Sequence, residues 1–470
     1  MDDYAKALLI DALTVVSCVV LLVRFGGLRF SHPATPYIVF HLHTVTTRLY
    51  GLLHGATPLY SGWRGLYDPV RPDEIARAAL YCDFAFMAVT AVWTFVSTRP
   101  RPTDKPPGSA VKLEPRILLP VLLLTLVGGV IGLKISAHVP GVEKFEGFSQ
   151  GSDWASSSYI LILPSWFGLA VLGHIYYYGF RWYTNILLAA YLALMSIQGG
   201  LRFRVIVGLL LAATIWVDRK GRNWPSRTMI IGLAITGVLF FPMKAIGTMT
   251  QEGRSFSEIS AVVSDSFDEV AEGSAADHQF LDEFASALTL LDLQGKKYYG
   301  SIYLPLLTLP IPRAWWPEKP KLAPFISDIS SPTRPMAQSG MIATYLGESY
   351  ANLGLVGIIA IPPLLAFCLA WFSRRAYLVP YDSLLRFSYV LLSVNLIQVF
   401  RDGLQSIVIF TFVNMMPLMI VVIAHLTIAR IRKRYYASTS LGRLQARVRE
   451  SEPQVPSKSD GLTDALMIRR

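Results

Sequence analysis

The sequence predicts an all-α, polytopic integral membrane protein. Of its 470 residues, 53% are hydrophobic and only 16% are charged, which is more apolar surface than a soluble domain can bury. Apolar runs of roughly 17–25 residues, each long enough to cross a hydrocarbon core as a helix, recur along the chain. Basic residues gather between alternate runs. Together these observations indicate many membrane-spanning helices.

We expect about eleven spans. They are Leu8–Val23, Tyr37–Gly55, Ile75–Val96, Ile117–Ile135, Tyr159–Tyr178, Ile186–Ile197, Val205–Val217, Met229–Met243, Ile342–Phe372, Leu384–Phe400 and Leu404–Ala429. The first run follows Met1, Asp2 and Asp3 and not a basic segment, so we expect it to stay as an anchor and not to be cleaved as a signal peptide.

The positions of the basic residues predict the topology. The net charge of +11 does not indicate nucleic-acid binding, because the charges lie at the ends of the apolar runs. The basic clusters are Arg24/Arg29, Arg99/Arg101/Lys105/Lys112/Arg116, Arg219/Lys220/Arg222/Arg227, Arg374/Arg375 and Arg430/Arg432/Lys433/Arg434. Basic residues favour cytoplasmic loops. The N-terminus is therefore expected outside, and the C-terminal tail in the cytoplasm.

This topology divides the chain into four parts. Residues 1–244 hold the first eight spans and a proline-rich cytoplasmic linker at 98–115. Residues 245–340 form a large extracytoplasmic loop, and 341–430 hold the last three spans. The polar tail at 431–470 is expected to be cytoplasmic and disordered. Cys18, Cys82 and Cys368 each fall in an apolar run, which favours buried, inert thiols.

The large loop has two halves of different character. Thr250–Gln294 is acidic and is predicted to be helical, because apolar residues recur at near-helical intervals. These are Phe267, Val270, Phe280, Phe284, Leu288 and Leu291. This half could lie over the membrane opening. Leu304–Pro335 contains repeated prolines, which exclude a continuous helix and favour a stiff, irregular path.

Several charged and polar residues fall at predicted outer ends of helices or in the loop. They are Arg202, Arg204, Arg313, Lys319, Arg334, Glu348, Tyr350, Arg401 and Asp402. All would face the same side of the membrane. A cationic cavity there would suit a diphosphate, because arginine offers phosphate oxygens a planar fork of donors and lysine adds a compact charge.

Each of these residues also has a structural interpretation. Arg202 and Arg204 can extend to the interface, and Arg401 with Asp402 can form a local ion pair. Trp315 and Trp316 can anchor the loop at the interface. Glu348 is harder to explain structurally, because an ionisable group within a span is costly.

The second span is unusually polar, since it contains Arg48, His41 and His43. Such a helix is expected to line an aqueous cavity. The two histidines are not expected to bind a metal together, because residues two apart on a helix point to different faces.

Three segments resemble the Wzy-type oligosaccharide repeat-unit polymerases. They are Ile-Pro-Arg-x-x-Trp-Pro-x-Lys-Pro at Ile311–Pro320, Gly-Glu-x-Tyr-x-Asn-x-Gly at Gly347–Gly354 and Arg-Asp-Gly-Leu at Arg401–Leu404. The resemblance covers most of residues 185–425 and is weak before them. Gly199–Arg202, with the pattern Gly-Gly-x-Arg, adds to it only weakly.

The resemblance implies a GT-C-like glycosyltransferase in the bacterial plasma membrane, with its active site facing the periplasm or exterior. Such enzymes transfer a growing glycan from undecaprenyl diphosphate to the non-reducing end of a lipid-linked repeat unit of O-antigen, lipopolysaccharide or exopolysaccharide. Neither a metal nor another cofactor is needed. A chain-length regulator and a flippase of the same pathway are further candidate partners.

The resemblance also assigns roles to residues. Arg202, Arg313, Lys319 and Arg401 would stabilise the charge of the diphosphate leaving group. Glu348 is the first choice for the base that deprotonates the acceptor hydroxyl, with Asp402 and His278 as further choices. Arg204, Tyr350 and Trp316 would contact substrate.

Three other functions stay open at this point. An O-antigen ligase uses the same lipid-linked donor and differs only in its acceptor. A flippase or transporter of lipid-linked sugars often has paired internal repeats, and none is evident between the two halves of this sequence. A non-catalytic scaffold would explain the topology but not the cations gathered on one face.

Overall fold

A computed structural model of this protein describes residues 3–58, 60–61, 68–98, 158–197, 202–236, 280–308, 344–379 and 383–404, with isolated residues between and beyond these ranges. These ranges all belong to one compact unit, Met1–Pro417, and Leu418–Arg470 forms a second. Apart from turns and connecting segments, the described chain forms helices and one antiparallel pair, β1 (Tyr60–Ser61) and β2 (Asp68–Pro69). The predicted α-helical class is confirmed for the described part of the chain.

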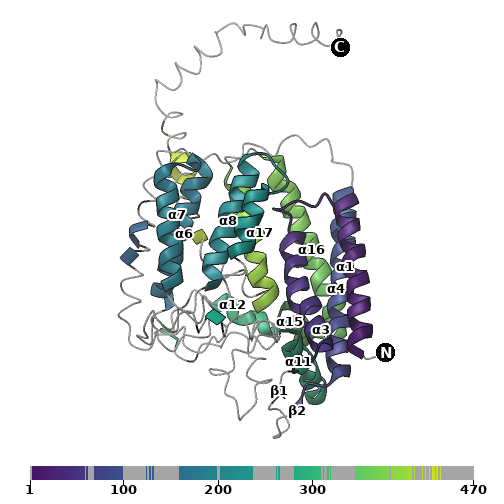
Figure 1. Ribbon diagram of the computed structural model, residues 1–470. Helices are drawn as coiled ribbons and strands as arrows, with labels where there is room; N and C mark the ends of the chain where they lie inside the picture. The colour runs from purple at the N-terminus through teal and green to yellow at the C-terminus, as the bar shows by residue number, and fades with distance from the viewer. Residues whose placement is uncertain are drawn as a thin grey trace. The chain divides into compact units, whose positions relative to one another are not determined.

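The helices of the first unit pack side by side (Figure 1). In chain order they are α1 (Asp3–Leu21), the π-helical η1 (Leu22–Gly26), α2 (Ala34–His41), the π-helical η2 (Leu42–Thr46), α3 (Thr47–Leu53), α4 (Pro72–Thr98), α6 (Ser158–Tyr178), α7 (Trp182–Ile197), α8 (Arg202–Arg219), α11 (Phe280–Gln294), the 3-10 turn η8 (Ser301–Tyr303), α12 (Leu304–Thr308), α15 (Thr344–Leu353), α16 (Leu355–Leu378) and α17 (Leu384–Asp402). α4 packs against α1, α11 and α16, whereas α17 packs against α2, α8 and α15. These contacts join segments that are far apart in the sequence.

Four described helices are long and apolar enough to cross a membrane. They are Asp3–Gly26, Pro72–Val96, Leu355–Leu378 and Leu384–Asp402. The first and third expose many large apolar side chains, including Leu9, Leu13, Val16, Val20, Ile359, Leu364, Phe367 and Trp371. Such faces suit hydrocarbon surroundings better than water. A membrane-embedded protein is therefore supported. The expected total of about eleven spans is not confirmed, because several of them fall partly or wholly outside the described residues.

The predicted ninth span, Ile342–Phe372, is two helices and not one. Gly354 separates α15 from α16 with φ +63°, a conformation that glycine adopts without steric cost. A second glycine allows close packing at this break, since a Cβ on Gly357 would overlap the carbonyl oxygen of Ser349. The short helix α15 is thus set apart from the long apolar helix α16, and it carries Glu348.

Helix α11 confirms part of the helix that the acidic half of the loop predicts. Its apolar residues at helical spacing are all buried, namely Phe280, Phe284, Leu288 and Leu291. The earlier members of the pattern, Phe267 and Val270, lie outside the described residues. α11 therefore packs with an apolar face into the unit, as an amphipathic helix does.

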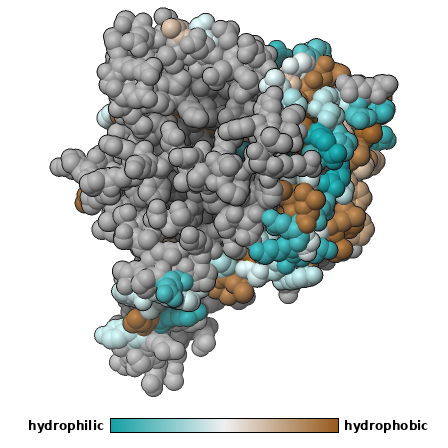
Figure 2. Space-filling model, turned by 90° about the horizontal axis from the view of Figure 1, so that it is seen from below, coloured by the Kyte–Doolittle hydropathy of each residue, from teal (hydrophilic) through white to brown (hydrophobic). Residues whose placement is uncertain are grey.

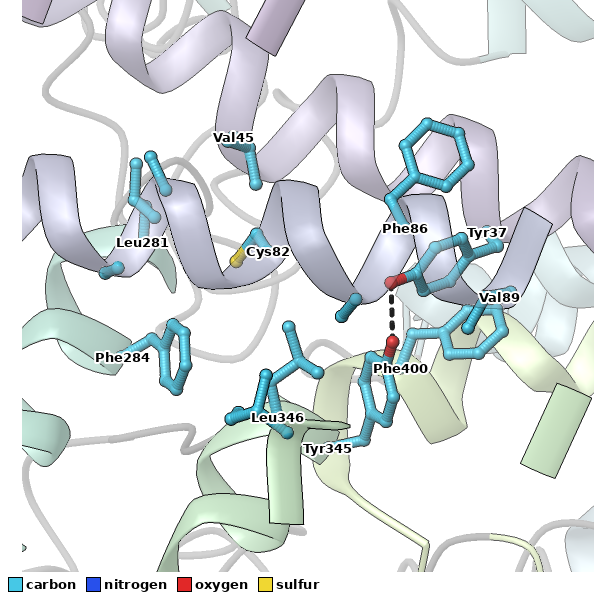
Figure 3. Close-up of a cluster of buried hydrophobic side chains, with 14 of the residues drawn as sticks. Tyr37, Val45, Cys82, Phe86, Val89, Leu281, Phe284, Tyr345, Leu346 and Phe400 are labelled. Carbon is cyan, nitrogen blue, oxygen red and sulfur yellow. Dashed lines mark hydrogen bonds between the residues drawn. The ribbon is translucent and has the colours of Figure 1, made fainter. Parts of the chain in front are cut away.

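The core of the unit centres on the aromatic ring of Tyr37 in α2. The ring lies 5.3 Å from that of Phe86, 5.9 Å from that of Tyr345 and 4.7 Å from that of Phe400. Figure 3 shows Tyr345 and Tyr37 facing each other, with the Tyr345 hydroxyl donating to the Tyr37 hydroxyl. Edge-to-face aromatic pairs add about 0.5–1.5 kcal/mol each beyond their buried area. This cluster holds α2, α15 and α17 together.

Some of the described basic residues lie at one end of the helices, where the ends of α8 and α16 meet the start of α17. Arg386 at the start of α17 pairs with Asp218 at the end of α8, with 2.6 Å between Nη2 and Oδ1. The Arg29 guanidinium carbon lies 3.5 Å from the ring centroid of Tyr377, at the end of α16. α11 and α15 lie at the opposite end, which is the lower one in Figure 1. The expected topology stays a prediction, because other described basic residues, among them Arg71 and Arg77, lie at the α11 end.

The cysteines differ in burial. Cys18 and Cys82 are buried, as predicted, whereas Cys368 is exposed. The prediction was wrong for Cys368 because it lies on the exposed apolar face of α16, beside Phe367. An apolar run does not reveal which of its residues face the core.

Candidate functional site

Glu348 and the turn after α17 meet at the end of the unit where α11 and α15 lie. Glu348 is only 2% exposed. Its Oε2 accepts a hydrogen bond from the backbone N–H of Leu404, with 2.6 Å between nitrogen and oxygen. This hydrogen bond brings the Gly-Glu-x-Tyr and Arg-Asp-Gly-Leu segments into contact. Its two partners, Glu348 and Leu404, are 56 residues apart in the sequence.

The turn depends on Gly403. Its φ is +94°, and its N–H donates to the carbonyl oxygen of Val399 at 2.9 Å. A Cβ at this position would overlap the Oε2 atom of Glu348. Glycine is therefore required at this position for two reasons, because it adopts the positive φ and because it leaves space for the carboxylate.

Arg401 is a partly exposed cation in the last turn of α17. Its side chain is 32% exposed, and its Nε lies 3.6 Å from Oδ1 of Asp402. Its guanidinium carbon is 5.7 Å from the ring centroid of Phe280. Among the described residues, Arg401 Nε has no hydrogen-bond acceptor. The ion pair with Asp402 is therefore long, and the partly exposed guanidinium is a cation of the kind that binds phosphate oxygens.

Asp402 has a second partner. Its Oδ2 accepts a hydrogen bond from Nε2 of Gln398, one turn earlier on α17. Gln398 is 3% exposed, so this contact fixes Asp402 toward the helix. The structure gives Asp402 a role in shaping the end of α17, and its predicted contact with substrate stays a prediction.

Two further residues surround Glu348, and the sequence reasoning missed both. Asn352 donates from Nδ2 to the carbonyl oxygen of Glu348 at 3.0 Å and accepts on Oδ1 from the N–H of Gly300 at 2.8 Å. Burial and, secondly, the charge of Glu348 raise the pKa of the Tyr303 phenol above its ordinary value. Asn352 belongs to the Gly347–Gly354 segment and could have been noticed. Tyr303 lies in no motif.

Tyr350 contacts α11 and α4. Its hydroxyl donates to Oδ1 of Asp292, whose Oδ2 accepts from Arg77 at 2.9 Å. Its ring stacks on that of Tyr81, with 6.2 Å between centroids. These contacts join three helices, and the predicted contact of Tyr350 with substrate stays a prediction.

Arg48, in the second predicted span, is buried in an ion pair. Its Nε lies 2.9 Å from Oδ1 of Asp282 and its Nη2 lies 2.6 Å from Oδ2, and both side chains are 0% exposed. Nη2 also donates to the carbonyl oxygen of Thr57 at 2.8 Å. The counter-charge comes from α11, far along the chain, so this pairing could not be predicted from the residues around Arg48. The pair joins α3 to α11.

The other predicted site residues are described only in part. Arg202 and Arg204 lie in the first turn of α8. Trp316 is 40% exposed and Trp315 is 82% exposed, which fits either a ligand contact or interfacial anchoring. The remaining three, Arg313, Lys319 and His278, lie outside the described residues.

The end of the unit that carries Glu348 is polar in part. Figure 2 shows it from below, where hydrophilic and hydrophobic residues alternate over the described surface. At the start of α4, the side chains of Arg71 and Asp73 are 58% and 63% exposed. Charged side chains this exposed need water, so this end is not expected to lie within hydrocarbon.

The site thus combines a buried carboxylate, a protonated phenol and a partly exposed guanidinium. Such a set can bind an anionic group and receive a proton. Comparisons with family models, with curated proteins and with solved structures found no match.

Proposed function

We propose that this protein is a polysaccharide polymerase with a GT-C-like fold. It would be a metal-independent glycosyltransferase that joins undecaprenyl-diphosphate-linked repeat units on the outer face of the bacterial plasma membrane. The observation that supports this most is the contact of Glu348 with Leu404, because it unites two of the segments that resemble Wzy-type polymerases. The long apolar helices also suit an enzyme whose donor and acceptor are lipids.

In the proposed reaction, an acceptor sugar hydroxyl attacks the anomeric carbon of the donor glycan. The new glycosidic C–O bond forms as the bond to the diphosphate breaks, and the diphosphate leaves with the electron pair. Arg401 would stabilise the leaving group together with Arg313, Lys319 and Arg202. The hydroxyl proton would pass to Glu348 as general base. Diphosphate is already a good leaving group, so no separate acid is required.

The position of Glu348 allows a second contribution to the same reaction. Because Oε2 accepts the Leu404 N–H, the carboxylate also holds the turn that follows Arg401. A glutamine at 348 would keep an oxygen for this hydrogen bond but could not take a proton at neutral pH. Glu348→Gln therefore distinguishes two roles of Glu348. If Glu348 is the base, the substitution abolishes activity, and if Glu348 only positions the turn, activity is kept.

The test uses cells in which this gene is the only source of polymer. Arg401→Ala, Arg313→Ala and Glu348→Gln should each abolish polymer while the protein stays in the membrane fraction. Lys319→Arg should reduce it less, because charge is kept but the geometry changes. Arg71→Ala, which removes an exposed cation at the same end, should leave polymer unchanged. Full-length polymer from all three loss variants would remove the site assignment, and polymer from Glu348→Gln alone would reduce Glu348 to a positioning residue.

A further inference from the structure

A second cluster of ionisable residues lies inside the unit, apart from the contacts of Glu348. Asp11 on α1, His41 on α2 and Asp83 on α4 are 0%, 3% and 2% exposed. Asp11 and Asp83 belong to two helices that are long and apolar enough to span a membrane. Ionisable groups in such helices are costly and usually functional or paired. Three of them in one place therefore need an explanation.

The geometry of the cluster is compatible with a metal site, in which an ion would replace the hydrogen bond between His41 and Asp11. His41 Nε2 lies 2.8 Å from Oδ1 of Asp11 and 3.4 Å from Oδ1 of Asp83. The three ligand atoms all lie within 4.8 Å of one another. For metal–ligand bonds of roughly 2.1 Å, neighbouring ligand atoms are expected about 3.0–3.5 Å apart. The three atoms could thus contact a single ion with little movement.

The hydrogen bonding of the cluster is incomplete. Both carboxylate oxygens of Asp83 and Oδ2 of Asp11 have no hydrogen-bond partner among the described residues. A buried carboxylate with so few hydrogen-bond partners loses its hydration without full replacement, which is energetically costly. His41 cannot correct this alone, because one imidazolium balances only one of the two negative charges.

We propose that Asp11, His41 and Asp83 bind a divalent transition-metal ion of the zinc class. Imidazole nitrogen with two carboxylate oxygens is a ligand set that such ions accept. A divalent ion with neutral His41 also balances both carboxylates, so the interior becomes neutral.

The ion has a structural role and takes no part in the proposed glycosyl transfer. It would tie α1, α2 and α4 together at one point. Tyr37, one turn before His41 on α2, contacts Tyr345 at the start of α15, the helix that carries Glu348. Holding α2 in place would therefore also help to hold α15 in place. His43, which the sequence excluded as a second ligand to the ion, has no place in this set.

The test uses the purified full-length protein in detergent. After treatment with a chelator and removal of the chelator, Zn²⁺ is added, unbound metal is removed, and the bound metal is measured by mass spectrometry alongside Tm. Wild type should take up about one equivalent, and the ion should raise Tm by several degrees. His41→Gln and Asp83→Asn should each reduce the bound zinc to background. Asp3→Asn, an exposed aspartate on the same helix as Asp11, should bind zinc like wild type.

Two outcomes would overturn the proposal. If chelation leaves the Tm of the wild type unchanged and zinc is not taken up, the carboxylates share a proton and not a metal. If His41→Gln and Asp83→Asn retain as much zinc as wild type, the metal is bound elsewhere on the chain. The wild-type comparison does not depend on the variants, so it decides the matter even if a variant fails to fold.

Discussion

Gly403 is the residue whose identity the site depends on most directly. It lies between Arg401 and Leu404, it has φ +94°, and the space where its side chain would be is filled by the carboxylate of Glu348. From the sequence alone, Gly403 would be interpreted as an ordinary glycine at the C-terminal end of a helix. Only the structure shows that the turn and the carboxylate require each other.

We predict that Gly403→Ala disrupts the site more than a positive φ alone would explain. Gly55 is the matched control, because its φ is +95° and no atom lies within 4 Å of the position of a Cβ. Both variants should be destabilised by roughly 1–3 kcal/mol of backbone strain. Only Gly403→Ala should also displace Glu348 and abolish polymer. Thermal unfolding and polymer synthesis measure the two effects, and equal polymer from both variants would contradict this role.

Tyr303 gives a prediction about pH. Its pKa is raised in the folded protein, first by burial and then by Glu348. A raised pKa means that the stabilising contribution of the neutral phenol is complete below about pH 10 and is lost as the pH rises further. Tyr303→Phe should therefore flatten the fall in Tm at alkaline pH, whereas Tyr299→Phe, which alters a 76% exposed tyrosine, should not. An unchanged alkaline slope for Tyr303→Phe would contradict the raised pKa of Tyr303.

At the scale of helices, the sequence predicts which face of a helix is buried better than it predicts which residues pair between helices. The apolar face of α11 could be predicted from the spacing of Phe280, Phe284 and Leu288, because burial follows the helical period. The Arg48–Asp282 pair could not, since its partners are 234 residues apart and neither lies in a motif. The break at Gly354 was missed for another reason, because the apolar composition continues across it.

The ion pair between α3 and α11 should stabilise the fold strongly. Arg48→Ala leaves Asp282 charged and buried, which is expected to cost about 3–5 kcal/mol. Arg77→Ala removes one of the two partners of Asp292, also on α11. The side chains of Arg77 and Asp292 are 37% and 41% exposed, so this loss should cost about 1 kcal/mol or less. Unfolding in denaturant with detergent compares the two. Similar losses would show that the Arg48 pair adds no more than a surface pair.

At the scale of the whole chain, the helical class and the membrane character could be predicted from composition alone, because hydropathy requires little knowledge of contacts. The sequence predicted only that Glu348 and Arg401 lie on the same side of the membrane. Their direct contact depends on the packing of α15 against α17. The cluster of Asp11, His41 and Asp83 was not foreseen, since its members come from three helices.

The most direct measurement supplies purified lipid-linked repeat unit as the only substrate to the purified protein in proteoliposomes. Gel separation of the products then shows whether repeat units have been joined. We predict a ladder of glycans from the wild type and none from Arg401→Ala or Glu348→Gln. Unchanged repeat unit with the wild type, as a ligase without its acceptor or a transporter would leave it, would contradict the proposed polymerase.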